Sequence, residues 1–270
     1  MNIPSTFAGQ PSHLLPPLAA ILNGGASAQT VDDIALPGLF GFNSRDRRSR
    51  PFNLLRMQVM KIMKARQWKI IGVTSAAPRV GKTFMATNLA ASLSRIPGLQ
   101  TLLFDLDLRR GSVSESFRIP AGLGINAFLN GEVDSLEAAA YNVLGTGLTI
   151  YPSSPSNESS AELLAGERMQ ALVRAMRSLP DNVICICDLP PVFANDDAAI
   201  VLREIDAYLL VVEEGTTTAN QVHDAINVLQ PSPCMGTVLN RYHGGIGGSD
   251  FGFGYGTQKY YDKYYDDYYV

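Results

Sequence analysis

Residues 75–83 constrain this chain more than any other stretch, because they read Ser-Ala-Ala-Pro-Arg-Val-Gly-Lys-Thr. They follow residues 69–74, a short apolar run that predicts a buried strand. They precede residues 84–93, where apolar side chains recur at helical spacing. A loop of small residues that ends in Gly-Lys-Thr, between a strand and a helix, is typical of a phosphate-binding loop. The pattern therefore predicts a nucleotide site where the helix begins.

Each residue type in this loop suits contact with phosphate. Successive backbone N–H groups and the positive end of the helix dipole favour an anion. Lys82 is expected to bridge the terminal phosphates of ATP, and Thr83 to offer its hydroxyl to Mg²⁺. One departure from the usual pattern is Ala76, which stands where the first glycine is expected. The residues assigned to nucleotide binding are Ala77, Pro78, Arg79, Val80, Gly81, Lys82, Thr83 and Phe84.

Strand-like and helix-like stretches alternate along the rest of the chain. Apolar runs predict strands at residues 101–104, 148–151, 183–187, 208–212 and 236–241. Helical periodicity predicts helices at residues 51–66, 160–177 and 218–229. This alternation predicts an α/β fold, a doubly wound and mainly parallel sheet with helices on both faces, as in P-loop nucleotide-binding proteins.

Carboxylates stand at the ends of two predicted strands. Asp105 and Asp107 follow residues 101–104, and Asp188 follows residues 183–187. Ligands bind at the carboxyl ends of parallel strands, and residues two apart in a strand share a face. We therefore expect Asp105 and Asp107 to face the site, and Asp188 to hold Mg²⁺ directly or through water.

Asn240 and Arg241 end the last predicted strand. We assign both to the nucleotide-binding set because of this position at a strand end. Asn240 could hydrogen-bond the nucleotide base, and it could equally close a turn.

Composition excludes several classes of function. The formal charge of −3 argues against a nucleic-acid surface, and no apolar run approaches the ~18 residues that a membrane span needs. Cys185 and Cys187 alternate along an apolar run, which predicts small core residues rather than metal ligands. The three cysteines and three histidines of the chain show no ligand spacing. We therefore expect a cytoplasmic protein with no nucleic-acid partner.

The sequence divides into three predicted regions. Residues 1–50 are rich in Pro, Gly, Ser and Ala, lack a periodic apolar face, and are predicted to form a mostly disordered arm. Residues 51–245 are predicted to form the P-loop domain, including an amphipathic helix at its start. Residues 246–270 are predicted to form a flexible tail.

This tail is rich in tyrosine. Seven of the 11 tyrosines of the chain fall in its last 16 residues, and the glycine spacing with few aliphatic residues argues against a packed element. Such a tail suits phosphate acceptors or an aromatic binding tract, and the ATP site upstream favours acceptors. The tyrosines are Tyr255, Tyr260, Tyr261, Tyr264, Tyr265, Tyr268 and Tyr269.

On these motifs, the chain resembles the bacterial tyrosine kinases (BY-kinases) of capsule and exopolysaccharide export, over roughly residues 51–270. Residues 76–83 look like that family's Walker A motif, residues 104–109 like its Walker A′ motif, and residues 186–191 like its Walker B motif. Any one motif alone would indicate a P-loop ATPase. The combination with a tyrosine-rich tail is quite specific.

The resemblance implies a mechanism at particular positions. Lys82 and Thr83 would bind ATP·Mg²⁺, and Asp105 would activate the tyrosine hydroxyl, with Lys82 and Asp107 as further catalytic residues. The metal would be held by Thr83, Asp105, Asp107 and Asp188. The implied function is an ATP-dependent protein-tyrosine autokinase that phosphorylates its own tail and regulates polysaccharide polymerisation and export.

The resemblance also implies partners. The family's activator is a membrane-embedded regulator of polysaccharide chain length, which would bring this chain to the inner face of the cell membrane. The tail of one subunit would be phosphorylated by its neighbour, which implies self-association. The chain departs from the family's pattern at Arg79, where glycine is usual. It departs again at Arg50, Asn53 and Arg56, where the oligomerisation helix usually carries an acid and then two arginines.

Two alternative functions stay open on the sequence. One is a nucleotide-dependent switch resembling the ParA/MinD positioning ATPases, although that group has a lysine where this chain has Ala77. The other is a catalytically weak scaffold of an export complex, whose tail binds partners. Transfer of phosphate from ATP to tyrosine would separate the autokinase from both.

Overall fold

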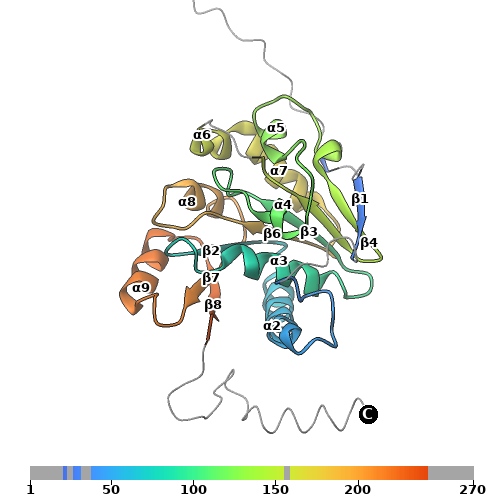
Figure 1. Cartoon of the computed structure of the whole chain (residues 1–270). Helices are drawn as coiled ribbons and strands as arrows, with labels where there is room; N and C mark the ends of the chain where they lie inside the picture. The colour runs from blue at the N-terminus through green and yellow to red at the C-terminus, as the bar shows by residue number, and fades with distance from the viewer. Residues whose placement is uncertain (1–20, 23–26, 32–37, 155–158, 243–270) are drawn as a thin grey trace, which may run out of the picture.

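The computed structural model describes residues 21–22, 27–31, 38–154 and 159–242. Its centre is a sheet whose strands lie in the order β1-β4-β5-β3-β6-β2-β7-β8 (Figure 1). Neighbouring strands are parallel except for β4 and β5, which are antiparallel. The strands are β1 (Ser27–Thr30), β2 (Ile70–Ser75), β3 (Gln100–Asp105), β4 (Tyr141–Leu144), β5 (Leu148–Tyr151), β6 (Val183–Asp188), β7 (Ala207–Glu213) and β8 (Cys234–Asn240).

Helices cover both faces of this sheet (Figure 1). Buried side chains of α2 and α3 pack on one face, and those of α7, α8 and α9 pack on the other. The helical elements are η1 (Arg47–Ser49), α2 (Arg50–Arg66), α3 (Lys82–Leu93), α4 (Val113–Ser116), α5 (Ile125–Leu129), η2 (Glu137–Ala139), α6 (Ser160–Ala165), α7 (Glu167–Ser178), α8 (Asp197–Leu202) and α9 (Ala219–Val228). The predicted α/β fold, with a doubly wound and mainly parallel sheet, is confirmed.

Alternation along the central strands explains the two layers. In β2, Ile70 joins the core on the α7 side and Ile71 joins the core on the α3 side. In β3, Phe104 joins the core on the α7 side, and Leu103 joins the core on the α3 side. Both β2 and β6 are buried along their full length, which is why their sequences read as continuous apolar runs. Because β2 is packed on both faces, its position in the sheet is well determined, and so is the start of the loop that follows it.

The helix predicted at residues 160–177 is in fact two helices. Gly166 separates α6 from α7 with a ψ of 165°, an extended conformation that ends the first helix. The apolar periodicity continues across this break because both helices bury side chains in the same core. Among the described residues, every helix is too short or too polar to cross a bilayer.

Residues 27–31 and 38–50 correct the prediction of a disordered arm. β1 pairs in parallel with β4 at the edge of the sheet, with Ser27 opposite Tyr141. Residues 38–49 then pack against the α3 side of the core and lead through η1 into α2. Residues 38–50 have no periodic apolar face because isolated contacts with α3 hold them in place.

Asn88 in α3 clamps this segment to the helix. Its Oδ1 accepts hydrogen bonds from the backbone N–H groups of Phe40 at 2.6 Å and Gly41 at 3.0 Å. Its Nδ2 donates to the carbonyl oxygen of Gly38 at 2.8 Å. A Cβ at Gly41 would collide with the backbone carbonyl of Asn88, so glycine permits this close approach. The ring of Phe40 also packs edge-on against Phe84, with ring centroids 6.2 Å apart.

The predicted amphipathic helix is confirmed as α2, and part of its polar face is used inside the chain. Arg56 Nη1 donates to the carbonyl oxygen of Ser92 at 2.8 Å. Asn53 Oδ1 accepts a hydrogen bond from Ser92 Oγ at 3.2 Å. Asn53 and Arg56, two of the three positions at which the chain departs from the pattern it resembles, therefore hydrogen-bond to α3.

We expect Asn88→Ala to lower the free energy of unfolding by about 2–4 kcal/mol, because it leaves three backbone groups without a partner. Urea unfolding followed by circular dichroism measures this change. Gln58→Ala, at an exposed position of α2, is the matched control and should change it by less than ~0.5 kcal/mol. If Asn88→Ala lowered the free energy of unfolding as little as the control does, the hydrogen bonds of Asn88 to residues 38–41 would not stabilise the fold.

Candidate nucleotide site

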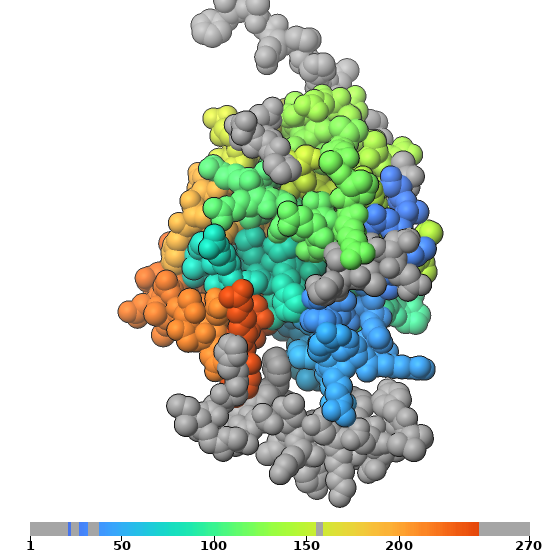
Figure 2. All heavy atoms as spheres, viewed as in Figure 1, coloured from blue at the N-terminus to red at the C-terminus, as the bar shows by residue number. Residues whose placement is uncertain are grey.

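The predicted phosphate loop joins β2 to α3 at the carboxyl edge of the sheet. Residues 76–81 form the loop, and Lys82 is the first residue of α3. Gly81 has a φ of 93°, which is left-handed, and a Cβ there would collide with the side chain of Asn240. The loop therefore needs glycine at this position. In the space-filling view, the orange-red end of β8 adjoins the teal part of the chain that includes α3 (Figure 2).

Arg79 also has a left-handed backbone, with a φ of 65°. A residue with a Cβ loses about 1–2 kcal/mol in this conformation relative to the right-handed one. The Arg79 side chain is exposed. The loop thus accepts arginine where glycine was expected, at a cost to stability.

Lys82 and Asp107 form an ion pair across the site. Lys82 Nζ lies 2.7 Å from Asp107 Oδ2, and the two side chains are 12% and 7% exposed. Burial alone would lower the pKa of Lys82, but the carboxylates of Asp188, Asp107 and Asp105 together raise it above its ordinary value. Lys82 therefore stays charged, and the pair links the phosphate loop to the turn that follows β3.

Thr83 and Asp188 form the second contact across the site. Thr83 Oγ1 donates to Asp188 Oδ2 at 2.6 Å, and Ser112 Oγ lies 3.2 Å from Thr83 Oγ1. Asp188 Oδ1 is buried and has no hydrogen-bond partner among the described groups. Burial raises the pKa of Asp188 to about 6, although Lys82 opposes this shift. A buried carboxylate oxygen without a partner is well placed to accept a cation as its ligand.

Asp105 is completely buried at the end of β3. Its Oδ1 accepts a hydrogen bond from the backbone N–H of Asp107, and its Oδ2 accepts one from the backbone N–H of Val113, both at 3.2 Å. Burial, with the neighbouring charge of Asp188, raises the pKa of Asp105 to about 7. This carboxyl group therefore changes its charge near neutral pH, as a general base at that pH must.

The unpaired groups of the site fit a nucleotide phosphate and Mg²⁺. The backbone N–H groups of Gly81, Lys82 and Thr83 donate to no acceptor among the described residues, as expected at a helix N-terminus. Within the same part of the chain, no group of three or more His, Cys, Asp or Glu side chains is arranged to hold a metal by itself. Mg²⁺ usually binds one or two carboxylates and completes its shell with water and phosphate oxygens. Thr83 and Asp188 fit that mode.

Three of the predicted nucleotide-binding side chains contact other groups of the protein. The Phe84 ring packs against aromatic rings of α2 and of the segment before it. Asn240 Nδ2 donates to the Val80 carbonyl at 2.8 Å, and Arg241 pairs with Glu213 at 2.6 Å. Their contact with a nucleotide stays a prediction. The seven tyrosines predicted as phosphate acceptors lie outside the described residues.

A polar network follows the turn after β3, and it was not predicted from the sequence. Arg109 Nε donates to Ser160 Oγ at 2.7 Å, and Ser160 Oγ donates to the buried Asp197 Oδ2 at 2.6 Å. Gly111 was missed as well, and a Cβ there would collide with Ser153 Oγ. The position of Arg109 just after the strand-end acids was an available signal. Ser160 and Asp197 are distant in sequence and offered none.

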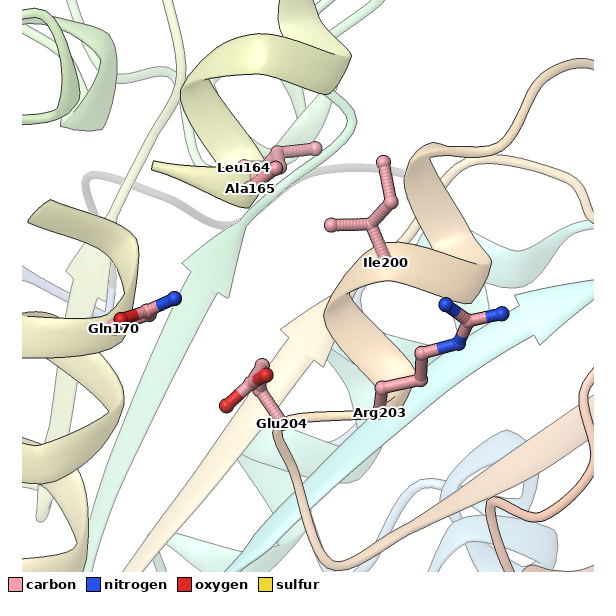
Figure 3. Close-up of a pocket in the computed structure, with 6 residues that line it drawn as sticks. All are labelled: Leu164, Ala165, Gln170, Ile200, Arg203 and Glu204. Atoms are coloured by element: carbon pink, nitrogen blue, oxygen red, sulfur yellow. The ribbon is translucent and has the colours of Figure 1, made fainter. Parts of the chain in front are cut away.

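A separate hollow of about 200 Å³ opens between α6, α7 and α8 (Figure 3). Its lining residues are Leu164, Ala165, Gln170, Ile200, Arg203 and Glu204. None of them belongs to the phosphate loop or to the acids that face it. The hollow is therefore distinct from the nucleotide site.

A Gly-Lys-Thr loop at a helix start, with acids from β3 and β6 beside it, defines a P-loop nucleotide-binding protein. No protein-family model matches the chain. The chain is 30% identical over 194 residues to the tyrosine-protein kinase YwqD of Bacillus subtilis, an alignment that covers 71% of this chain and 80% of YwqD. The chain therefore belongs to the family of bacterial tyrosine-protein kinases.

Other relatives are longer proteins. The chain is 30% identical over 207 residues to the tyrosine-protein kinase Etk of Escherichia coli K12, covering 76% of this chain and 28% of Etk. It likewise spans 26% of the tyrosine-protein kinase Ptk of Acinetobacter johnsonii, at 28% identity. The chain thus corresponds to less than a third of the length of either protein.

Two solved structures have folds similar to that of this chain. The kinase domain of Etk has a TM-score of 0.68 and 26% identity, and the match covers 82% of this chain and 85% of that domain. MinD of Pyrococcus horikoshii, described in complex with Mg-ADP, has a TM-score of 0.55 and 20% identity, covering 65% of this chain and 71% of MinD. The second likeness concerns the fold alone.

The raised pKa of Asp105 predicts that stability depends on pH when nucleotide and Mg²⁺ are absent. Its pKa is about 7 in the folded protein, against an ordinary value of 3.8, so the folded state keeps the proton to higher pH. The free energy of unfolding should therefore fall as pH rises between about 4 and 7, by up to about 1.4 kcal/mol per pH unit.

Urea unfolding across this pH range measures the effect. Asp105→Asn should flatten the fall, whereas Asp224→Asn, at an exposed position of α9, should leave the slope as it is in the wild type. An equally steep slope in Asp105→Asn and the wild type would contradict the role given to Asp105.

Proposed function

We propose that this chain is an ATP-dependent protein-tyrosine autokinase, which transfers phosphate from ATP·Mg²⁺ to tyrosines of its own C-terminal cluster. Its relatives YwqD and Etk are named tyrosine-protein kinases, which supports the proposal. The observation that carries it is the pairing of Lys82 with Asp107 and of Thr83 with Asp188 beside the buried Asp105. The proposed acceptors are Tyr255, Tyr260, Tyr261, Tyr264, Tyr265, Tyr268 and Tyr269.

A protein catalyses phosphoryl transfer mainly by positioning the reactants and by neutralising charge on the phosphate oxygens. Lys82 Nζ is 2.7 Å from a carboxylate oxygen of Asp107, so a phosphate oxygen can take the place of that partner without leaving the ammonium group unpaired. The backbone N–H groups of residues 81–83 add donors that point out of the helix N-terminus. These groups would hold the terminal phosphates of ATP.

Thr83 and Asp188 would hold Mg²⁺ beside those phosphates. The Thr83 hydroxyl would turn a lone pair toward the ion, and Asp188 would contribute a carboxylate oxygen directly or through water. When Lys82 binds phosphate, its contact with Asp107 would be released. The carboxylate of Asp107 would then accept hydrogen bonds from water molecules bound to the ion. Mg²⁺ in such a site neutralises charge on the phosphate oxygens.

Asp105 would accept the proton of the acceptor tyrosine's hydroxyl. Its pKa of about 7 suits a general base that works near neutral pH. Two backbone N–H groups fix the direction of its carboxylate. Because Asp105 is completely buried, this step requires the turn after β3 to open toward the incoming tyrosine.

We further propose that the chain acts at the inner face of the cell membrane through a membrane-embedded regulator of polysaccharide chain length. In that setting it would regulate polysaccharide polymerisation and export, as the family resemblance implies. The kinase domain would span residues 51–245, extended by β1 and residues 38–50, with residues 246–270 as the acceptor tail. Arg56 and Asn53 bind α3, so self-association would use other residues of α2.

Lys82→Met is expected to abolish tyrosine phosphorylation, because it removes the charge that holds the phosphates. The purified full chain is incubated with ATP·Mg²⁺, with and without the cytoplasmic segment of a candidate activator, and its intact mass is measured. Lys64→Met, an exposed lysine of α2, is the matched control and should gain phosphate as the wild type does.

The same experiment separates the alternatives. No added mass in the wild type under either condition would refute the autokinase. ATP hydrolysis without transfer to tyrosine would then favour a nucleotide switch of the ParA/MinD type. ATP binding without hydrolysis or transfer would favour a scaffold.

Thr83→Val tests the metal role because it removes the hydroxyl and keeps the shape. ATP binding measured by calorimetry in the presence of Mg²⁺ should weaken by roughly 10-fold or more, and binding in EDTA should change little. Thr87→Val is the control, since the Thr87 hydroxyl bonds to backbone carbonyls of its own helix. An equal loss with Mg²⁺ and with EDTA would contradict a metal contact at Thr83.

A further inference from the structure

Two exposed arginines flank the nucleotide site. Arg79 lies in the phosphate loop, three residues before Lys82, and Arg110 lies three residues after Asp107. The Lys82–Asp107 ion pair at 2.7 Å joins the two segments that carry these arginines. Among the described residues, neither side chain has an ion-pair or hydrogen-bond partner.

Other arginines near the site differ from these two. Arg109 bonds to Ser160, and Arg241 pairs with Glu213 at 2.6 Å. Their charges are therefore already engaged by groups of the same chain. Arg79 keeps a long charged side chain although its left-handed backbone favours glycine, so a ligand for that charge would account for the residue.

The tail carries a repeated pattern of charge around its tyrosines. Residues 259–262 read Lys-Tyr-Tyr-Asp, and residues 263–267 read Lys-Tyr-Tyr-Asp-Asp. In an extended peptide, residues two apart point to the same side. The sequence has an acidic residue two positions after a tyrosine in three cases, Tyr260 with Asp262, Tyr264 with Asp266, and Tyr265 with Asp267, and in an extended substrate each acid would share a side with its tyrosine.

Three other tail tyrosines lack this feature. Two positions after Tyr261 stands Lys263, and two positions after Tyr255 stands Thr257. Tyr268 is followed at that distance by Val270. The pattern thus divides these six tyrosines into two classes.

The last strand before the tail, β8, ends next to the phosphate loop. Asn240, at the end of β8, donates to the carbonyl oxygen of Val80 at 2.8 Å. From Asn240 to Tyr260 the chain has about 20 residues, which span up to roughly 65 Å when fully extended. The tail is therefore long enough to reach its own site or that of a neighbouring subunit.

We infer that Arg79 and Arg110 select tyrosines that carry an acidic side chain two residues later. The inference rests on the proposed autokinase and specifies its substrate class. With the acceptor hydroxyl at Asp105, the carboxylate two residues on forms a charge-assisted hydrogen bond with an arginine at the rim of the site. Tyr260, Tyr264 and Tyr265 are then phosphorylated before Tyr255, Tyr261 and Tyr268.

The test follows the order of phosphorylation in the full chain. The protein is incubated with ATP·Mg²⁺ for short times, and phosphate on each tyrosine is measured by peptide mass spectrometry. Asp262→Asn should slow Tyr260 relative to Tyr264 by roughly 3- to 10-fold. Because both tyrosines are on the same molecule, their ratio is independent of ATP affinity and of folding yield.

The arginines are tested by the same ratio. Arg79→Gln and Arg110→Gln should each reduce the preference for Tyr260 over Tyr261, and the double variant should bring it close to one. Arg174→Gln, an exposed arginine of α7, is the matched control and should keep the wild-type order.

The outcomes separate this inference from the function on which it rests. Phosphate on the tail with the same order in the wild type, Asp262→Asn and the arginine variants would overturn the selection by arginine and leave the autokinase standing. No phosphate on any tail tyrosine would overturn both. A changed order in Asp262→Asn alone would show that the acid is read by groups other than these arginines, and would also overturn the assignment.

Discussion

One largely buried lysine, set among three buried carboxylates, is the arrangement on which the rest of the site depends. Lys82 lies 2.7 Å from Asp107, while Asp105 and Asp188 are completely buried at the ends of neighbouring strands. Burial of these acids is costly unless a cation or several donors stand nearby, and the raised pKa values of Asp105 and Asp188 report that cost. Sheet order imposes the arrangement, because β6 lies between β2 and β3. A Mg²⁺ ion would therefore relieve an unfavourable cluster of negative charge that the fold itself creates.

The layer on the α3 side of the sheet holds the phosphate loop in place. Asn88 fixes the segment before α2 against α3, and Phe84, which follows Thr83 directly, contacts rings from that segment and from α2. On the other side of the loop, Asn240 bonds to the Val80 carbonyl. The segment before α2 and the end of β8 therefore both contact the candidate nucleotide site, through Phe84 and Val80.

Local rules of sequence were enough to predict the strand, loop and helix around Lys82, and the acids at the ends of β3 and β6. Strand ends and period-two alternation depend on neighbouring residues, which a sequence displays directly. Such rules could not predict contacts between segments that are far apart in the sequence. β1 is only four residues long and reads Ser-Ala-Gln-Thr, so it has no apolar pattern that a sequence rule could detect. The contact of Asn88 with residues 40 and 41 depends on one side chain and leaves no periodic pattern either. The bond between Ser160 and Asp197 likewise joins two positions that no spacing rule connects.

The most direct test of this account is a crystal structure of the chain with Mg²⁺ and a non-hydrolysable ATP analogue. We expect Lys82 Nζ to leave Asp107 for a phosphate oxygen, and the Thr83 hydroxyl to leave Asp188 Oδ2 and contact Mg²⁺. A complex in which both original contacts persist and the nucleotide binds elsewhere would contradict the central claim that these residues form the phosphate site.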